Sequence, residues 1–159
     1  MKYGYLSGSV IQGSIPLVVK TLKLIAMQEI QPIFEKESLF GFNETVELLI
    51  TAATDRDWGN PANHDLQQSL AKAGKSVRPV KVVEICKPAY SGAMLEKSDE
   101  RIVSVMMPCR ISVYEKADGK IYVATLNGRM FASSMPENIR GTMVEAADEI
   151  EEIVKTVVG

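Results

Sequence analysis

The chain has 159 residues, of which 46% are hydrophobic and 24% are charged. A chain of this length buries roughly 70% of the surface that it exposes when unfolded, so it can fold as one compact domain without a metal or disulfide staple. Its 18 basic residues are balanced by 20 acidic ones, for a formal net charge of −2. This balance lacks the excess of Lys and Arg that is typical of nucleic-acid-binding proteins, and we expect no nucleic-acid partner.

The longest mostly apolar stretch, residues 10–27, does not predict a membrane segment. Gln12, Lys20 and Lys23 interrupt it, whereas a membrane-spanning helix needs about 20 predominantly apolar residues. The stretch also lacks the small-residue cleavage site of a signal peptide. With only two cysteines in the chain, these features predict a cytoplasmic protein with free thiols and no membrane partner.

The first 38 residues are predicted to be an extension that carries an amphipathic helix and packs on or next to the main domain. Residues 2–10 favour a short strand or an extended arm. From Ser14 onward, apolar residues recur every three or four positions, which is the period of one helical face, and Pro32 ends or kinks this helix. The apolar face consists of Ile15, Val18, Val19, Leu22, Ile25, Ala26, Ile30 and Ile33.

Residues 39–159 are predicted to form the main domain, which begins with helices. Asn43 is a candidate N-cap for a helix with an apolar stripe from Val46 to Ala53. A short helix over 66–73 follows, with candidate caps at 63–65 and Gly74 at its C-terminal end.

Strands dominate the middle of this domain. Residues 80–86 are rich in β-branched side chains and form the clearest strand, and a helix is expected over 89–97. Residues 109–115 and 120–126 alternate around Asp118-Gly119, which predicts a β-hairpin.

The last predicted helix spans 136–158 and has the most regular pattern in the chain. Its apolar residues are spaced alternately by four and three positions, as in the seam of a coiled coil. Two interpretations are open: this face packs on a sheet, or part of it meets its copy in a dimer. The residues concerned are Ile139, Met143, Ala146, Ile150, Ile153 and Val157.

Both cysteines are predicted to lie at strand ends. Cys86 ends a strand directly before Lys87, and Cys109 begins one directly before Arg110. Each thiol is either a small hydrophobic core residue or part of a thiol site, in which Lys87 and Arg110 lower the thiol pKa. Alternation places Cys109 on the same face as Ile111.

A soft metal such as Cu(I) or zinc is a candidate cofactor for such a thiol site. His64 and Met107 are candidate further ligands beside Cys86 and Cys109, because imidazole, thiolate and thioether groups suit soft metals. The single histidine excludes a zinc site with several imidazoles in one protomer. The spacings of 22 and 23 residues between His64, Cys86 and Cys109 match no local metal motif.

Several of these segments together resemble the domain-of-unknown-function 302 family. They are Gly59-Asn60-Pro61, His64-Asp65-Leu66-Gln67, Arg78-Pro79-Val80-Lys81-Val82, Glu84-Ile85-Cys86-Lys87-Pro88 and Met106-Met107-Pro108-Cys109-Arg110. The resemblance covers roughly residues 42–127. It implies an α+β fold similar to the TATA-binding-protein-like architecture, with an antiparallel sheet and helices packed on one face, in a homodimer. It implies no activity.

Three functions are compatible with the sequence. The first is a non-catalytic homodimeric binding or interaction module whose thiols only pack. The second is a thiol site that holds a soft metal, a sulfur species or a redox equivalent. The third is a small-molecule enzyme with a pocket near Trp58, His64 and Tyr90, in which His64 is the general base because its unperturbed pKa lies near neutrality.

Overall fold

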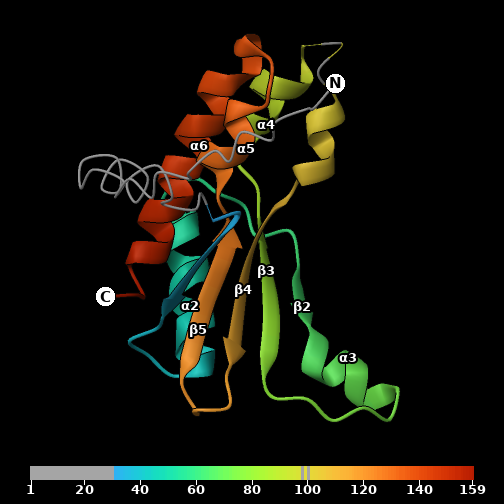
Figure 1. The fold of residues 1–159 in the computed structure, drawn as a ribbon, viewed down its shortest axis with the longest axis vertical. Helices are drawn as coiled ribbons and strands as arrows, with labels where there is room; N and C mark the ends of the chain where they lie inside the picture. The colour runs from blue at the N-terminus through green and yellow to red at the C-terminus, as the bar shows by residue number, and fades with distance from the viewer. Residues whose placement is uncertain (1–30, 98, 100) are drawn as a thin grey trace, which may run out of the picture. The chain divides into compact units, whose positions relative to one another are not determined.

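The computed structural model describes residues 31–97, 99 and 101–159 (Figure 1). The compact unit that they form begins at Gln31. The predicted extended arm and the amphipathic helix, up to residue 30, lie outside the described residues.

A five-stranded antiparallel sheet is the centre of this unit, with the strand order β1-β5-β4-β3-β2. The hairpin of β4 and β5 turns at Gly119, which has a φ of 79°, a backbone conformation that glycine adopts without strain. The strands are β1 (Ile33–Glu37), β2 (Asn63–Asp65), β3 (Val80–Ile85), β4 (Cys109–Glu115) and β5 (Ile121–Leu126).

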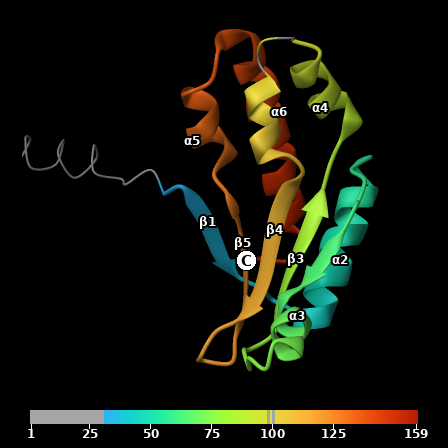
Figure 2. The same ribbon diagram turned by 90° about the vertical axis from the view of Figure 1, so that its right-hand side faces the viewer.

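Two helices, α2 and α6, cover one face of the sheet, and no helix of the described residues covers the other face (Figures 1 and 2). The shorter helices α4, α5 and η1 gather at the end of the sheet where β3 ends and β4 begins (Figure 2). The predicted α+β fold, an antiparallel sheet with helices on one face, is thereby confirmed. The helices are α2 (Phe42–Thr54), α3 (Leu66–Lys72), α4 (Pro88–Leu95), η1 (Arg101–Met106), α5 (Gly128–Ser133) and α6 (Glu137–Lys155).

The sequence predicted the N-cap of α3 correctly but not that of α2. Asp65 caps α3 as expected, since its side chain accepts a hydrogen bond from the Gln68 amide at 2.8 Å. The prediction of Asn43 as the cap of α2 is wrong, because that helix already begins at Phe42. Gly41 is its N-cap residue and makes no side-chain cap hydrogen bond.

The sheet also includes residues that the sequence predicts to belong to the N-terminal extension. Ile33 lies in β1, opposite Leu126 of β5, and β1 forms an edge of the sheet. The predicted boundary at residue 38 therefore falls after a strand of the sheet, and the compact unit starts eight residues earlier than residue 39.

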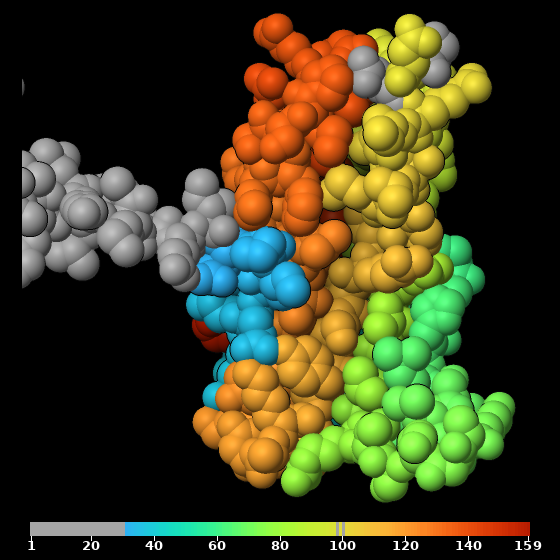
Figure 3. Space-filling view, turned by 45° about the vertical axis from the view of Figure 1, so that its right-hand side comes forward, coloured from blue at the N-terminus to red at the C-terminus, as the bar shows by residue number. Residues whose placement is uncertain are grey.

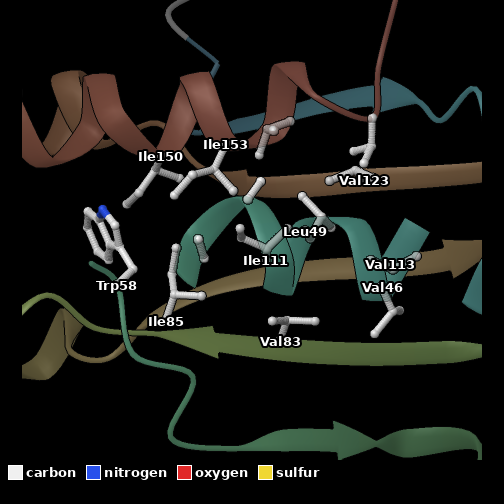
Figure 4. Packing of buried hydrophobic residues seen from close by; sticks show 14 of the residues in the cluster. Val46, Leu49, Trp58, Val83, Ile85, Ile111, Val113, Val123, Ile150 and Ile153 are labelled. Carbon is white, nitrogen blue, oxygen red and sulfur yellow. The ribbon is translucent and has the colours of Figure 1, made fainter. Parts of the chain in front are cut away.

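The apolar face of α6 packs inside the unit. Ile150 and Ile153 of this helix lie over Leu49 of α2 and Ile111 of β4 (Figure 4). All six seam residues are less than 9% exposed. Four seam residues, Ala146, Ile150, Ile153 and Val157, pack in the core beside the sheet, and Ile139 and Met143 pack against α4, η1 and α5.

A smaller cluster of buried residues lies at the helical end of the sheet. It joins α4, η1, α5 and α6 through Met94, Val103, Ala132, Ile139 and Met143. This second cluster adjoins the first residues of β4, where Cys109 lies.

Candidate functional site

Both cysteines are free thiols and lie at strand ends, as the sequence predicted; the structure adds that these two strand ends are neighbours. Cys109 is the first residue of β4 and is the register partner of Ile85, the last residue of β3. Cys86 follows directly, and its thiol lies 3.8 Å from the hydroxyl of Ser91 in α4.

The Cys109 thiol is not activated. Burial raises its pKa to about 11, with a further contribution from Cys86. The prediction that basic neighbours lower this pKa is wrong for Cys109, because Lys87 and Arg110 have other partners. Lys87 pairs with Glu149 at 2.8 Å, and Arg110 pairs with Glu84 at 3.3 Å. Cys109 is therefore a protonated thiol at neutral pH.

Cys109 lines a pocket of about 320 Å³ at the helical end of the sheet. The surface is hollowed there between the orange helix α5 and the yellow η1, with α6 at its floor (Figure 3). We call it the methionine pocket. It is lined by Phe34, Met94, Val103, Val105, Met106, Met107, Pro108, Cys109, Arg110, Thr125, Leu126, Asn127, Gly128, Arg129, Met143, Ala146, Ala147, Ile150 and Glu151.

Sulfur and hydrocarbon groups make up most of this lining. Four of the eight methionines of the chain are in it, namely Met94, Met106, Met107 and Met143. Methionine side chains are flexible and polarizable, so they adapt to apolar ligands of different shapes. The pocket is therefore an adaptable apolar cavity that also contains one thiol.

Three charged side chains belong to the lining, two basic and one acidic. Arg110 comes from β4, Arg129 from α5 and Glu151 from α6. Arg129 pairs with Asp148, and Glu151 lies 3.5 Å from Lys155. Two basic residues and one acidic residue therefore line a mainly apolar pocket, and both arginines are paired with carboxylates.

His64 lies in β2, and its partner belongs to β3. Its Nε2 is 3.1 Å from the Glu84 carboxylate, which also accepts a hydrogen bond from Arg110. Burial by itself raises the Glu84 pKa, but the hydrogen bonds from His64 and Arg110 outweigh it and hold this pKa below the ordinary value. His64 is not among the residues that line the methionine pocket.

The predicted neighbours Trp58 and Tyr90 do lie together, with ring centroids 5.8 Å apart. Both donate to Glu149 of α6, Trp58 at 2.8 Å and Tyr90 at 2.6 Å, and Lys87 donates to the same carboxylate. The hydrogen bond to Glu149, followed by burial, raises the Tyr90 pKa to about 12. These interactions tie α6 to α4 and to the segment before β2, so they stabilise the fold.

The predicted metal ligands are only partly brought together. Met107 and Cys109 share the methionine pocket, whereas His64 and Cys86 are not in its lining. Among residues 31–97, 99 and 101–159, no group of three or more His, Cys, Asp or Glu side chains is arranged to hold a metal ion.

Sequence reasoning missed Met94, Met143 and Arg129 as residues of one site. Each methionine alone is typical of a buried helix face, and Arg129 is typical of an exposed one. One signal was available: six of the eight methionines fall between residues 94 and 143. This enrichment marks a region with a soft, adaptable interior.

Fold and site together define a class of protein: an α+β domain with a single antiparallel sheet and an apolar pocket at its helical end. The model of the family Domain of unknown function DUF302 matches residues 34–157. The chain belongs to this family.

The fold is similar to the crystal structure of an uncharacterized conserved protein DUF302 from Bacillus stearothermophilus, with a TM-score of 0.71 and 17% sequence identity. The similarity covers 79% of this chain and 97% of that one. No curated protein matches the chain. Within its described residues, no helix is long and apolar enough to cross a membrane.

Proposed function

We propose that the domain is a non-catalytic module that binds a small apolar molecule in the methionine pocket. The observation that carries this proposal is the pocket itself, whose volume of about 320 Å³ is typical of ligand sites. Its lining is mainly apolar with a few polar groups, which is the usual composition of a small-molecule site.

The chemistry of the lining supports binding over catalysis. Cys109 is the nucleophile among the lining residues, and its raised pKa keeps it in the unreactive thiol form. The general base that the enzyme hypothesis requires, His64, is outside the lining and is engaged with Glu84. The proposal therefore keeps the binding module of the first function and adds a pocket in which the ligand would bind.

A neutral fluorescent probe tests this function. N-Phenyl-1-naphthylamine brightens in apolar sites, and we expect saturable binding of one molecule per chain. Ala146→Leu places three more carbon atoms at a buried lining position of α6 and should abolish binding. Ala93→Leu makes the same change at an exposed position of α4 and should not affect it. No saturable binding by the wild-type protein, or equal binding by a folded Ala146→Leu variant, would contradict the proposal.

A second candidate function is the binding of Cu(I), and the observation that favours it is the presence of one thiol and four thioethers in a single pocket. These are the ligands that Cu(I) prefers. Competition with a chromophoric Cu(I) chelator tests it. Cys109→Ser should abolish Cu(I) binding and leave the neutral probe unaffected, and Cys86→Ser, outside the lining, should change neither. Wild-type protein that leaves all Cu(I) on the chelator would exclude this function.

The homodimer and the cytoplasmic location stay proposals. A dimer interface would have to lie away from the apolar face of α6, because that face is buried within the unit. The open face of the sheet is one alternative surface.

A further inference from the structure

We propose that the ligand of the methionine pocket carries an acidic group and that Arg110 binds this group. This inference rests on the proposed function, because it names the chemical class of the molecule that the pocket takes: an apolar chain or ring with one anionic end.

The position of Arg110 is the first observation. It follows Cys109 in β4 and belongs to the lining of the pocket, while its side chain is 61% exposed. A lining residue whose side chain is exposed lies at the mouth, where a bound molecule would keep its polar end in contact with water.

The hydrogen bonding of Arg110 is the second observation. The carboxylate of Glu84, a buried residue, accepts its Nε–H at 3.3 Å. In the described part of the chain, the two terminal nitrogens of Arg110 have no hydrogen-bond partner. Glu84 thus holds the guanidinium in place and leaves its outer edge available to an anion, which arginine binds with two parallel hydrogen bonds.

Charge around the mouth is the third observation. Arg129 of α5 is a second basic lining residue, but its charge is paired with Asp148, and Glu151 is the one acidic residue in the lining. The chain as a whole has a net charge of −2, so a preference for anions cannot come from its overall charge. A preference for anions would have to come from the terminal nitrogens of Arg110, because Arg129 already pairs with Asp148.

Carboxylate, sulfonate and phosphate ends share this recognition chemistry, whereas neutral and cationic ends do not. The matched set of octanoate, 1-octanol and octylammonium keeps one apolar chain and changes only the charge at its end. Each compound is titrated against the wild-type protein carrying the neutral probe N-phenyl-1-naphthylamine, and the displacement constants are compared. Octyl sulfonate and octyl phosphate then distinguish between the acidic groups.

We expect octanoate to displace the probe at about tenfold lower concentration than 1-octanol, the ratio that one charge-assisted hydrogen bond supplies. Octylammonium should be the weakest of the three. In Arg110→Gln, octanoate should bind no better than 1-octanol, while the affinity for 1-octanol stays the same. Arg78→Gln is the matched control. This substitution removes the same charge as Arg110→Gln, but Arg78 pairs with Glu115 outside the pocket lining.

The outcomes separate this inference from the proposed function. If the neutral probe binds but octanoate and 1-octanol displace it equally well, the acidic-ligand inference is overturned and the apolar site stands. If the probe does not bind at all, the proposed function is contradicted, and the inference that rests on it falls with it. Equal losses of octanoate affinity in Arg110→Gln and Arg78→Gln would assign the preference to general charge and overturn the role of Arg110. The comparison of the three displacement constants in wild-type protein does not depend on whether any variant folds.

Discussion

At the scale of single residues, Glu149 accepts hydrogen bonds from three side chains. Its two carboxylate oxygens accept from Trp58, Tyr90 and Lys87, which belong to two other segments of the chain. Burial by itself raises the Glu149 pKa, but these hydrogen bonds outweigh it and lower the pKa below its ordinary value of 4.5. Because the folded-state pKa is the lower one, the stabilisation is present above pH 4.5 and is lost as the pH falls through the folded-state value.

We predict that Glu149→Gln lowers the free energy of unfolding at pH 7 by about 1–3 kcal/mol, the usual range when hydrogen bonds to a charged group are lost. The difference from wild type should shrink as the pH falls below 4.5. Urea unfolding at pH 7, 5 and 3 measures it. Glu145→Gln, at an exposed position of the same helix, is the control and should show neither effect. A difference that grows toward pH 3 would contradict the assigned pKa direction.

Cys109 gives a second prediction at this scale. Its pKa is raised from 9.0 to about 11, so its thiolate fraction at pH 7.5 is about 100-fold lower than that of an unperturbed thiol. We therefore expect iodoacetamide to alkylate Cys109 about 100-fold more slowly in the folded protein than in urea-unfolded protein at the same pH. Peptide mass spectrometry follows the rate. Equal rates in the two states would show that the thiol is neither buried nor shifted.

At the scale of elements, α6 decides how the core is built. Ile153 is fully buried and packs with residues of α2 and the sheet (Figure 4). We predict that Ile153→Ala lowers the free energy of unfolding by about 2–5 kcal/mol, as other buried Ile and Leu truncations do. Ile102→Ala, at a side chain that is 74% exposed in η1, should change it by less than about 0.5 kcal/mol.

Sedimentation of the same two variants separates packing from association. A core role for Ile153 leaves the oligomeric state of the folded variant unchanged. If Ile153→Ala instead converts a dimer into stable monomers with wild-type unfolding energy, the helix face is an interface and the packing described above is not the solution structure.

The elements also show why sequence reasoning succeeded in some places and failed in others. α6 has five turns of regular apolar spacing, β3 is rich in β-branched residues, and β4 alternates before a Gly turn, so these local patterns predicted all three. β1 is largely exposed, with the sequence Ile-Phe-Glu-Lys-Glu, and β2 has only three residues. Such edge strands form because a neighbour offers free backbone groups, and a single segment does not carry that information.

At the scale of the whole molecule, the candidate site is formed by residues that only the tertiary structure brings together. The sequence placed Met107 and Cys109 in one turn, and the structure adds Met94 from α4 and Met143 from α6. Residues separated by tens of positions converge there only because α4, η1, α5 and α6 meet at one end of the sheet. Two of the four sequence-derived ligand candidates, Cys109 and Met107, therefore lie in the pocket, while Cys86 and His64 do not line it.

The most direct test of the account follows the methyl groups of the methionines by NMR, in wild-type protein labelled with 13C at these methyls and titrated with N-phenyl-1-naphthylamine. The NMR signals of methionine methyl groups shift when a ligand, especially an aromatic one, packs against these groups. The account predicts saturable shifts for Met94, Met106, Met107 and Met143, which line the pocket, and none for Met130, which does not. Shifts that are absent, or as large at Met130 as at the four pocket methionines, would contradict a ligand site in the methionine pocket.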